Sequence, residues 1–194
     1  MKRREFFKNT AMVGGGFALS GIPGFSSAAG IFSSQEPEAP WFDKAMRWAQ
    51  LAYVENDPGN YDPDFWLDYF RKIHVDGVLL SAGGIVAFYP TEIPLHHRSD
   101  RLGNSDPLGY LVSECRKMGM SIILRTDSHA ARQEFYDAHP DYIAVTSDGH
   151  KRPHWARNDL WVTCALGPYN FDFMTKVHRE IMQRYQPEGI FTNR

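Results

Sequence analysis

The sequence predicts an α/β protein of the (β/α)8 TIM-barrel type, and this chain is expected to cover only about the first four βα units. Apolar runs alternate with capped amphipathic helices along the chain, which is the order that produces a parallel sheet. The first apolar run is followed by neither G-x-G-x-x-G nor a P-loop, which disfavours a doubly wound nucleotide-binding sheet. Polar stretches follow the expected carboxyl ends of the strands, where a barrel builds its site.

The first unit combines a strand over residues 46–57 with a helix over residues 62–73. Asp62 is expected to cap this helix, with Pro63 in its first position. The apolar face expected to cover the sheet is formed by Phe65, Trp66, Tyr69, Phe70 and Ile73. A second strand over residues 76–84 is nearly all apolar, as expected for a strand that is buried on both faces.

A long polar stretch over residues 85–106 follows the second strand. It leads to a helix over residues 106–119, which again opens with an Asp-Pro pair and closes at a glycine. The third strand, residues 120–127, reads "MSIILRTD" and carries charge at its carboxyl end. These signals complete the second βα unit and start the third.

An irregular insert is expected over residues 128–168, with a short helix near residues 131–140 and a turn at Asp148-Gly149. A third major helix over residues 171–185 then leads to a fourth strand, "PEGIFTNR". Residues 41–194 are therefore expected to be the N-terminal half of a barrel. Half a barrel leaves a sheet edge open, which native proteins avoid, so we expect a longer protein or pairing with a second copy.

The first 30 residues are predicted to be an export signal. Arg3 and Arg4 in "RREFFK" resemble the twin-arginine signal of bacteria, and the apolar run at residues 11–19 is too short for a stable membrane span. Residues 31–40 are rich in Ser, Pro and Glu and are predicted to be a linker. We therefore expect a periplasmic or secreted bacterial protein that the twin-arginine export machinery recognises.

Composition narrows the class of ligand. Lys and Arg number 21 against 23 Asp and Glu, and no basic run is interleaved with aromatic residues, so no nucleic-acid partner is expected. The aromatic content of 14% serves core packing first. Flat rings also stack on the C–H faces of sugars, so the composition is compatible with a carbohydrate ligand.

The charged end of the third strand is the strongest candidate site. Residues two apart share a face of a strand, so Arg125 and Asp127 are expected to face the barrel axis, while Leu124 and Thr126 face the helices. A guanidinium and a carboxylate in that place are costly unless they pair with each other or with a ligand. The two alternatives are a structural ion pair and a ligand site, which His129 could join.

A metal site is a further alternative. Asp127, His129 and the pair His96-His97 are conceivable ligands of zinc or manganese, since imidazole and carboxylate groups suit both ions. However, the sequence holds no H-x-H or H-E-x-x-H. We therefore expect neither a metal nor another cofactor, and a metal-dependent hydrolase stays an alternative.

Polar residues at the other strand ends complete a predicted cleft for a polyhydroxylated ligand. Asp127 is the candidate catalytic residue. The candidate substrate-binding residues are Glu55, Asn56, His96, His97, Arg125, His129 and Asn193. The insert adds four rings, for which a surface position is the alternative: His139, His150, His154 and Trp155.

The strand "SIILRTDSH" and the insert sequence "HPDYIAVTSDGH" resemble the bacterial family called hypothetical glycosyl hydrolase 6, a relative of the family 29 α-L-fucosidases and of β-galactosidase-like barrels. The resemblance spans roughly residues 41–194. It implies a (β/α)8 barrel that hydrolyses O-glycosidic bonds of exported or environmental carbohydrate. A non-catalytic carbohydrate-binding barrel is the alternative within the same resemblance.

One departure from that resemblance concerns the nucleophile. Fucosidase-like barrels are similar in placing an aspartate at the end of the fourth strand, whereas here the strand reads "EGIFTNR", with Thr192 and Asn193 in that region. Retaining hydrolysis needs two carboxyl groups about 5 Å apart. The sequence offers Asp127 and Glu55, neither of which has the fucosidase position.

Overall fold

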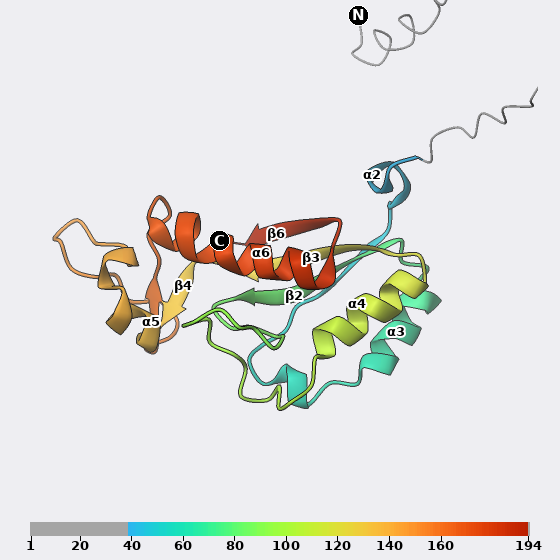
Figure 1. The fold of residues 1–194 in the computed structure, drawn as a ribbon, viewed down its shortest axis with the longest axis horizontal. Coiled ribbons are helices and arrows are strands. Elements are labelled where there is room, and N and C mark those ends of the chain that lie inside the picture. The colour runs from blue at the N-terminus through green and yellow to red at the C-terminus, as the bar shows by residue number, and fades with distance from the viewer. Residues whose placement is uncertain (1–38, 194) are drawn as a thin grey trace, which may run out of the picture. The chain divides into compact units, whose positions relative to one another are not determined.

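Four parallel strands form the main sheet of the described residues, 39–193, in a computed structural model of the chain (Figure 1). The strands are β1 (Trp48–Leu51), β2 (Gly77–Gly84), β3 (Ser121–Asp127) and β6 (Gly189–Asn193), in the order β1-β2-β3-β6. Each neighbouring pair is parallel. Helices connect the strands, so the predicted α/β class with a parallel sheet is confirmed.

The predicted export signal, residues 1–30, lies outside the described residues, as do residues 31–38 of the predicted linker. The division of the chain at residues 30 and 40 therefore stays a prediction. The first described helix is α2 (Trp41–Lys44), a single turn that precedes β1. No helix within the described part of the chain is long and apolar enough to cross a membrane.

Three helices pack against the sheet: α3 (Pro63–Lys72), α4 (Pro107–Lys117) and α6 (Met174–Tyr185). The side chain of Asp62 accepts hydrogen bonds from two backbone N–H groups in the first turn of α3, at 3.0 and 3.3 Å. Asp106 accepts one from the first turn of α4, at 2.9 Å. Both Asp-Pro pairs therefore start helices as predicted, because the carboxylate satisfies backbone donors that have no partner inside the helix.

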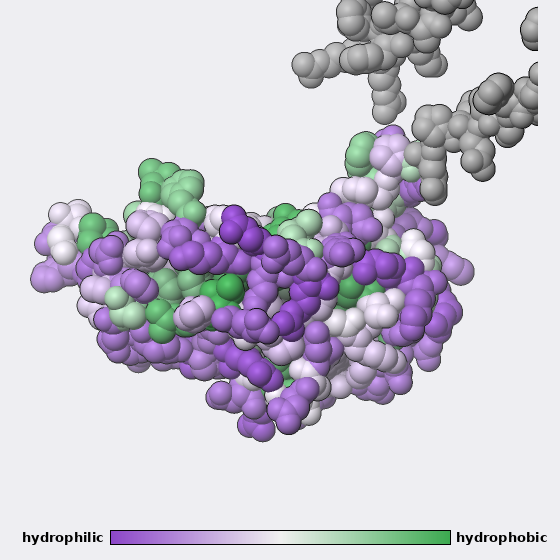
Figure 2. Space-filling model, in the orientation of Figure 1, coloured by the Kyte–Doolittle hydropathy of each residue, from purple (hydrophilic) through white to green (hydrophobic). Residues whose placement is uncertain are grey.

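The core lies between these helices and one face of the sheet. In β3 the side chains of Ile122, Leu124 and Thr126 are fully buried, whereas Arg125 and Asp127 on the opposite face are partly exposed. The predicted assignment of the two faces of this strand is therefore confirmed. The outer surface over α4 and α6 is mostly hydrophilic in Figure 2, as expected for helices that turn their apolar side inward.

The predicted apolar face of α3 is largely wrong. The buried side chains are Leu67 and Phe70, with Trp66 packed partly against the core. Phe65 and Tyr69 stack on each other at the surface, where they are 58% and 45% exposed, and Ile73 is 41% exposed. Side chains four residues apart form one strip along a helix, and the strip that starts at Phe65 is turned away from the strip that meets the sheet.

The first strand is shorter than the predicted range of residues 46–57. After Leu51 the regular pairing with β2 ends, and the backbone N–H of Tyr53 donates to the side-chain hydroxyl of Ser81 in β2 at 3.2 Å instead of to a backbone carbonyl. A 3-10 turn then runs over Asp57–Gly59. Residues 54–57, which include Glu55 and Asn56, therefore belong to a loop at the carboxyl end of β1, which is where the site was predicted.

The insert after β3 has more regular structure than predicted. The strands β4 (Ala130–Arg132) and β5 (Leu160–Val162) pair antiparallel, and α5 (Gln133–Ala138) lies at the predicted short helix. Trp161 of β5 stacks on Tyr136 of α5 with ring centroids 4.2 Å apart. In Figure 1 the insert lies beyond the arrowheads of β2 and β6, at the carboxyl edge of the sheet.

In the second half of the chain, one predicted feature is confirmed and one boundary differs in detail. The turn at Asp148-Gly149 is present, with Gly149 at φ 87° and the Thr146 N–H donating to the His150 carbonyl at 2.8 Å. The helix predicted from residue 171 is a π-helical turn over Tyr169–Phe173 that continues into α6. This difference does not change the topology.

Gly84 at the end of β2 gives a direct test of this packing. Its φ is 111°, and a Cβ there would overlap the backbone of Asp127. Gly103 also has a positive φ, 56°, but a Cβ there would meet nothing within 4 Å. We expect Gly84→Ala to lower the free energy of unfolding by about 4 kcal/mol or more and Gly103→Ala by about 1–2 kcal/mol. Urea denaturation of the two variants measures the difference, and equal losses would contradict the close approach of β2 and β3.

Candidate functional site

The parallel register brings three residues to the same level at the carboxyl edge of the sheet. Gly84 of β2 pairs with Asp127 of β3, and Asp127 pairs with Asn193 of β6. Asp127 Oδ1 accepts hydrogen bonds from Arg125 Nη2 at 2.8 Å and from Asn193 Nδ2 at 2.7 Å. Among the described residues, none donates a hydrogen bond to Oδ2 of Asp127. One oxygen of this carboxylate is therefore fixed, while the other is available to a ligand.

A cleft of about 320 Å³ opens in front of this carboxylate. It is lined by five of the predicted site residues: Glu55, Arg125, Asp127, His129 and Asn193. Tyr53, Phe88 and Leu160 add apolar and aromatic surface. A few convergent polar groups in an otherwise apolar cavity are typical of small-molecule sites. The cleft lies at the carboxyl ends of parallel strands, as predicted.

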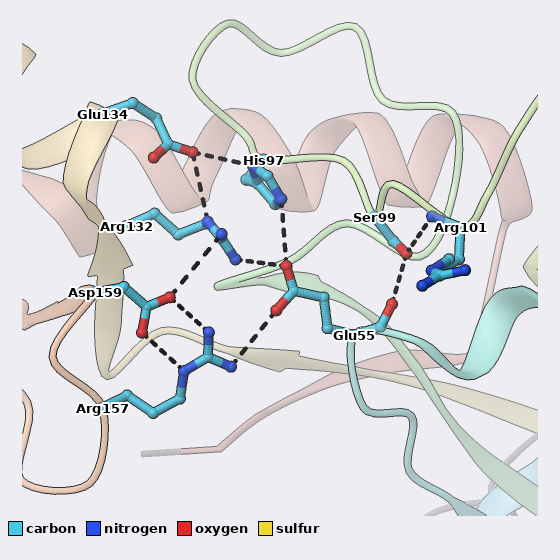
Figure 3. A network of polar contacts seen from close by, with 8 residues as sticks. All are labelled: Glu55, His97, Ser99, Arg101, Arg132, Glu134, Arg157 and Asp159. Carbon is cyan, nitrogen blue, oxygen red and sulfur yellow. Dashed lines mark hydrogen bonds and ion pairs between the residues drawn. The ribbon is translucent and has the colours of Figure 1, made fainter.

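Glu55 lies at the centre of a network of charged groups at one wall of the cleft (Figure 3). Its Oε1 is 2.6 Å from Nη1 of Arg132 and 3.5 Å from Nε2 of His97. Its Oε2 is 3.5 Å from Nη1 of Arg157. Both carboxylate oxygens are therefore engaged by groups that come from the loop after β2 and from the insert.

Two acidic side chains close the outer part of this network (Figure 3). Asp159 binds the Arg157 guanidinium through both oxygens, which lowers the pKa of Asp159 below its usual range. Glu134 Oε1 lies 3.0 Å from Nδ1 of His97 and 3.6 Å from Nε of Arg132. The network connects β4, α5 and the segment before β5 to the loop after β1.

The pair His96-His97 is divided by the structure. His97 belongs to the Glu55 network, whereas His96 is 4% exposed and does not line the cleft. His96 Nε2 accepts the backbone N–H of Gly84 at 3.1 Å, and its Nδ1 lies 3.2 Å from the Thr91 hydroxyl. Burial lowers the pKa of His96 to about 4. This neutral imidazole supports the end of β2 from behind.

The loop over residues 85–106 is held in place by Glu180 of α6. Its carboxylate accepts hydrogen bonds from the Tyr89 hydroxyl at 2.6 Å, the Thr91 hydroxyl at 2.6 Å and the Glu92 backbone N–H at 2.7 Å. Three bonds to one ionised group are stronger than bonds between neutral groups. Glu180 therefore positions the segment that carries both histidines.

One predicted residue is not part of this arrangement. Asn56 is exposed, does not line the cleft, and takes part in the described hydrogen bonds through its carbonyl, which accepts from Asn60 Nδ2 at 3.0 Å. The sequence reasoning also missed Arg132 and Arg157. No local pattern marks them, because they reach Glu55 across 77 and 102 residues of chain.

Metal binding finds no support in the described residues. Within residues 39–193, no three His, Cys, Asp or Glu side chains lie close enough together to hold a metal ion. In particular, the imidazole of His96 is occupied by Gly84 and Thr91, so the four side chains considered as an alternative ligand set do not form one. The metal-dependent hydrolase therefore has no candidate centre here.

Comparison with known proteins identifies the family. Residues 63–194 match the family model described as hypothetical glycosyl hydrolase 6. The chain belongs to this family. The resemblance noted from the third strand and the insert is thereby confirmed. Among curated proteins, no sequence matches this chain.

Solved structures show the same fold. An α-L-fucosidase isoenzyme 2 from Paenibacillus thiaminolyticus has a TM-score of 0.61 at 18% identity and covers 76% of this chain. A hypothetical protein from Ruminiclostridium thermocellum has a TM-score of 0.56 at 8% identity over 76% of this chain and 75% of that chain. A maltogenic α-amylase AmyB from Thermotoga neapolitana has a TM-score of 0.51 at 12% identity, over 75% of this chain and 38% of that chain.

These structural similarities show that the chain has the fold of a partial (β/α) barrel, as predicted from the order of strands and helices. The chain spans only 23% of the length of the fucosidase. At such identities the comparison shows the fold alone, so activity must be argued from the site itself.

His96 predicts a pH dependence of stability. The unfolded chain takes up a proton on this histidine near pH 6.5, whereas the folded protein takes it up only near pH 4. The free energy of unfolding therefore falls as the pH drops through this window, by about 3 kcal/mol at pH 4 relative to pH 7. Urea denaturation of the wild type and of His96→Gln at both pH values measures this contribution. The same pH dependence in both proteins would contradict it.

Proposed function

We propose that this chain is part of a glycoside hydrolase that cleaves O-glycosidic bonds of exported or environmental carbohydrate. The observation that carries the proposal is the Asp127 carboxylate, which has one oxygen fixed by Arg125 and Asn193 and the other available in the cleft. Membership of a glycosyl hydrolase family supports it. Arg125, Asn193 and His129 would bind the sugar beside this carboxylate.

Asp127 would act as the nucleophile or as the base that activates water. Glycosidases use two carboxyl groups, and their separation decides between retention and inversion. Glu55 lines the same cleft, but both of its oxygens are engaged by Arg132, His97 and Arg157. We therefore give Glu55 an orienting role and assign no proton donor among the described residues.

An α-L-fucoside is the first substrate to test. The neighbour with a TM-score of 0.61 is an α-L-fucosidase, and a β-galactoside follows because the sequence also resembles β-galactosidase-like barrels. For location we propose the periplasm or the exterior of a bacterial cell, reached by the twin-arginine route. The proposal on location rests on the sequence of residues 1–30.

A non-catalytic carbohydrate-binding barrel is the second candidate. It is favoured by the sequence of β6, which carries Thr192 and Asn193 where the family 29 enzymes are expected to hold an aspartate. The Asn193 amide donates a hydrogen bond to the Asp127 carboxylate. Asn193 therefore supports Asp127 and does not itself supply the carboxylate expected at the end of β6. Binding without turnover is what this candidate predicts.

Replacement of Asp127 separates the two candidates. We expect the full-length protein to hydrolyse an aryl glycoside from a panel that includes α-L-fucoside and β-galactoside, and Asp127→Asn to lower kcat by about 100-fold or more. Asp100→Asn, a change at an exposed aspartate, is the matched control and should leave kcat unchanged. Initial rates with and without a chelator measure both effects.

The outcomes assign the function. Turnover that depends on Asp127 and survives the chelator supports the glycosidase. Sugar binding without turnover of any substrate would leave the binding barrel, and loss of activity on chelation would revive the metal-dependent hydrolase.

A further inference from the structure

A short loop that begins at His154 and returns at Leu160 places an exposed indole at the rim of the cleft. The backbone N–H of His154 donates to the Leu160 carbonyl at 2.9 Å, which closes the loop at its base. Arg157 within the loop reaches Glu55 at 3.5 Å. Trp155, which directly follows His154, is 72% exposed. A large aromatic side chain is therefore carried, facing water, on a loop that is held in place.

The indole extends the wall of the cleft outward. The Trp155 ring stacks on the His154 imidazole with centroids 4.0 Å apart and an interplanar angle of 26°. The His129 ring lies 5.7 Å from it, at 28°. Both histidines line the cleft, whereas Trp155 does not. The three rings therefore form a continuous aromatic surface that starts inside the cleft and ends outside it.

The His154 ring beneath the indole is fixed by contacts of its own loop. Its Nδ1 accepts the backbone N–H of Ala156 at 3.2 Å, so in the neutral ring the proton sits on Nε2. Nε2 is buried and has no hydrogen-bond partner among the described residues. A buried donor without a partner costs free energy. Because Nε2 is closed to solvent, the His154 ring serves the site through its stacking on Trp155 and not as a donor to the ligand.

We propose that Trp155 is a stacking platform for a second sugar unit of an oligosaccharide whose first unit occupies the cleft. The inference rests on the proposed function, since it takes carbohydrate as the ligand. A flat ring with an open face matches the C–H face of a pyranose, and rigid aromatic contacts bind at low entropic cost. The cleft volume of about 320 Å³ is at the lower end for ligand pockets, so a larger carbohydrate must extend past its rim.

Within this arrangement the residues have separate tasks. Trp155 contributes apolar contact with the second sugar, and the His154 ring fixes the orientation of the indole by stacking on it. Arg157 and Asp159 hold the loop against the Glu55 network and do not contact the second sugar. The preferred substrate is accordingly an oligosaccharide, because it gains a contact with Trp155 that a simple monosaccharide glycoside lacks.

The test compares short and long ligands by isothermal titration calorimetry of the full-length protein, in the Asp127→Asn background so that no probe is consumed. The probes are methyl α-L-fucoside with 2′-fucosyllactose, and methyl β-D-galactoside with lactose. We expect Trp155→Ala to weaken oligosaccharide binding by about 10-fold while the methyl glycosides bind within about two-fold of the parent. Trp155→Phe, which keeps a flat ring, should retain most of the affinity.

A matched control and the opposing outcomes complete the design. Phe42→Ala removes another exposed aromatic, 62% exposed on α2, and should change neither affinity. Oligosaccharide binding that is unchanged in Trp155→Ala would overturn the platform and leave the proposed function standing. Equal weakening of short and long probes would place the stacked sugar in the cleft and also overturn it. A parent protein that binds none of the four probes would overturn the proposed function together with this inference.

Discussion

Parallel pairing of β2, β3 and β6 in a single register is the constraint on which the site depends. It places Gly84, Asp127 and Asn193 at one level of the sheet. The Asp127 carboxylate and the Asn193 amide therefore meet at the carboxyl edge, beside a glycine that has no side chain. A slip of one residue would turn Asp127 toward the helices and bring Thr126 into the cleft, because side chains alternate between the faces of a strand. Gly84 allows the strands to approach this closely.

Two carboxylates attach the surrounding segments to that edge. Glu180 binds three groups of the loop after β2 and holds it against α6. Glu55, on the loop after β1, binds Arg132 and Arg157 of the insert. Single ion pairs near a surface contribute little stability. A network of connected hydrogen bonds and ion pairs that is partly buried holds the wall of the cleft more effectively. The cleft is therefore shaped by contacts between segments that are distant in sequence.

The division of work between two acidic residues is the main functional feature of this wall. Glu55 has both oxygens engaged by cationic groups, whereas Asp127 is held by one oxygen and leaves the other available in the cleft, as the proposed hydrolysis requires. Arg157 links the Glu55 network to the loop at the rim of the cleft, because the loop that carries Arg157 also carries Trp155. The proposed reach of the site toward a longer ligand thus depends on the network around Glu55, whereas Asp127 is held separately by Arg125 and Asn193.

The sequence by itself determined the α/β class, the helix starts at Asp62 and Asp106 and the two faces of β3, since caps and alternation are properties of neighbouring residues. It did not determine which strip of α3 is buried, because several apolar strips competed for one sheet. It could not reveal that Arg132 and Arg157 reach Glu55, for those partners are 77 and 102 residues apart. Only the tertiary structure decided these contacts, because the folded path of the loops, and no local pattern, sets which distant charges meet.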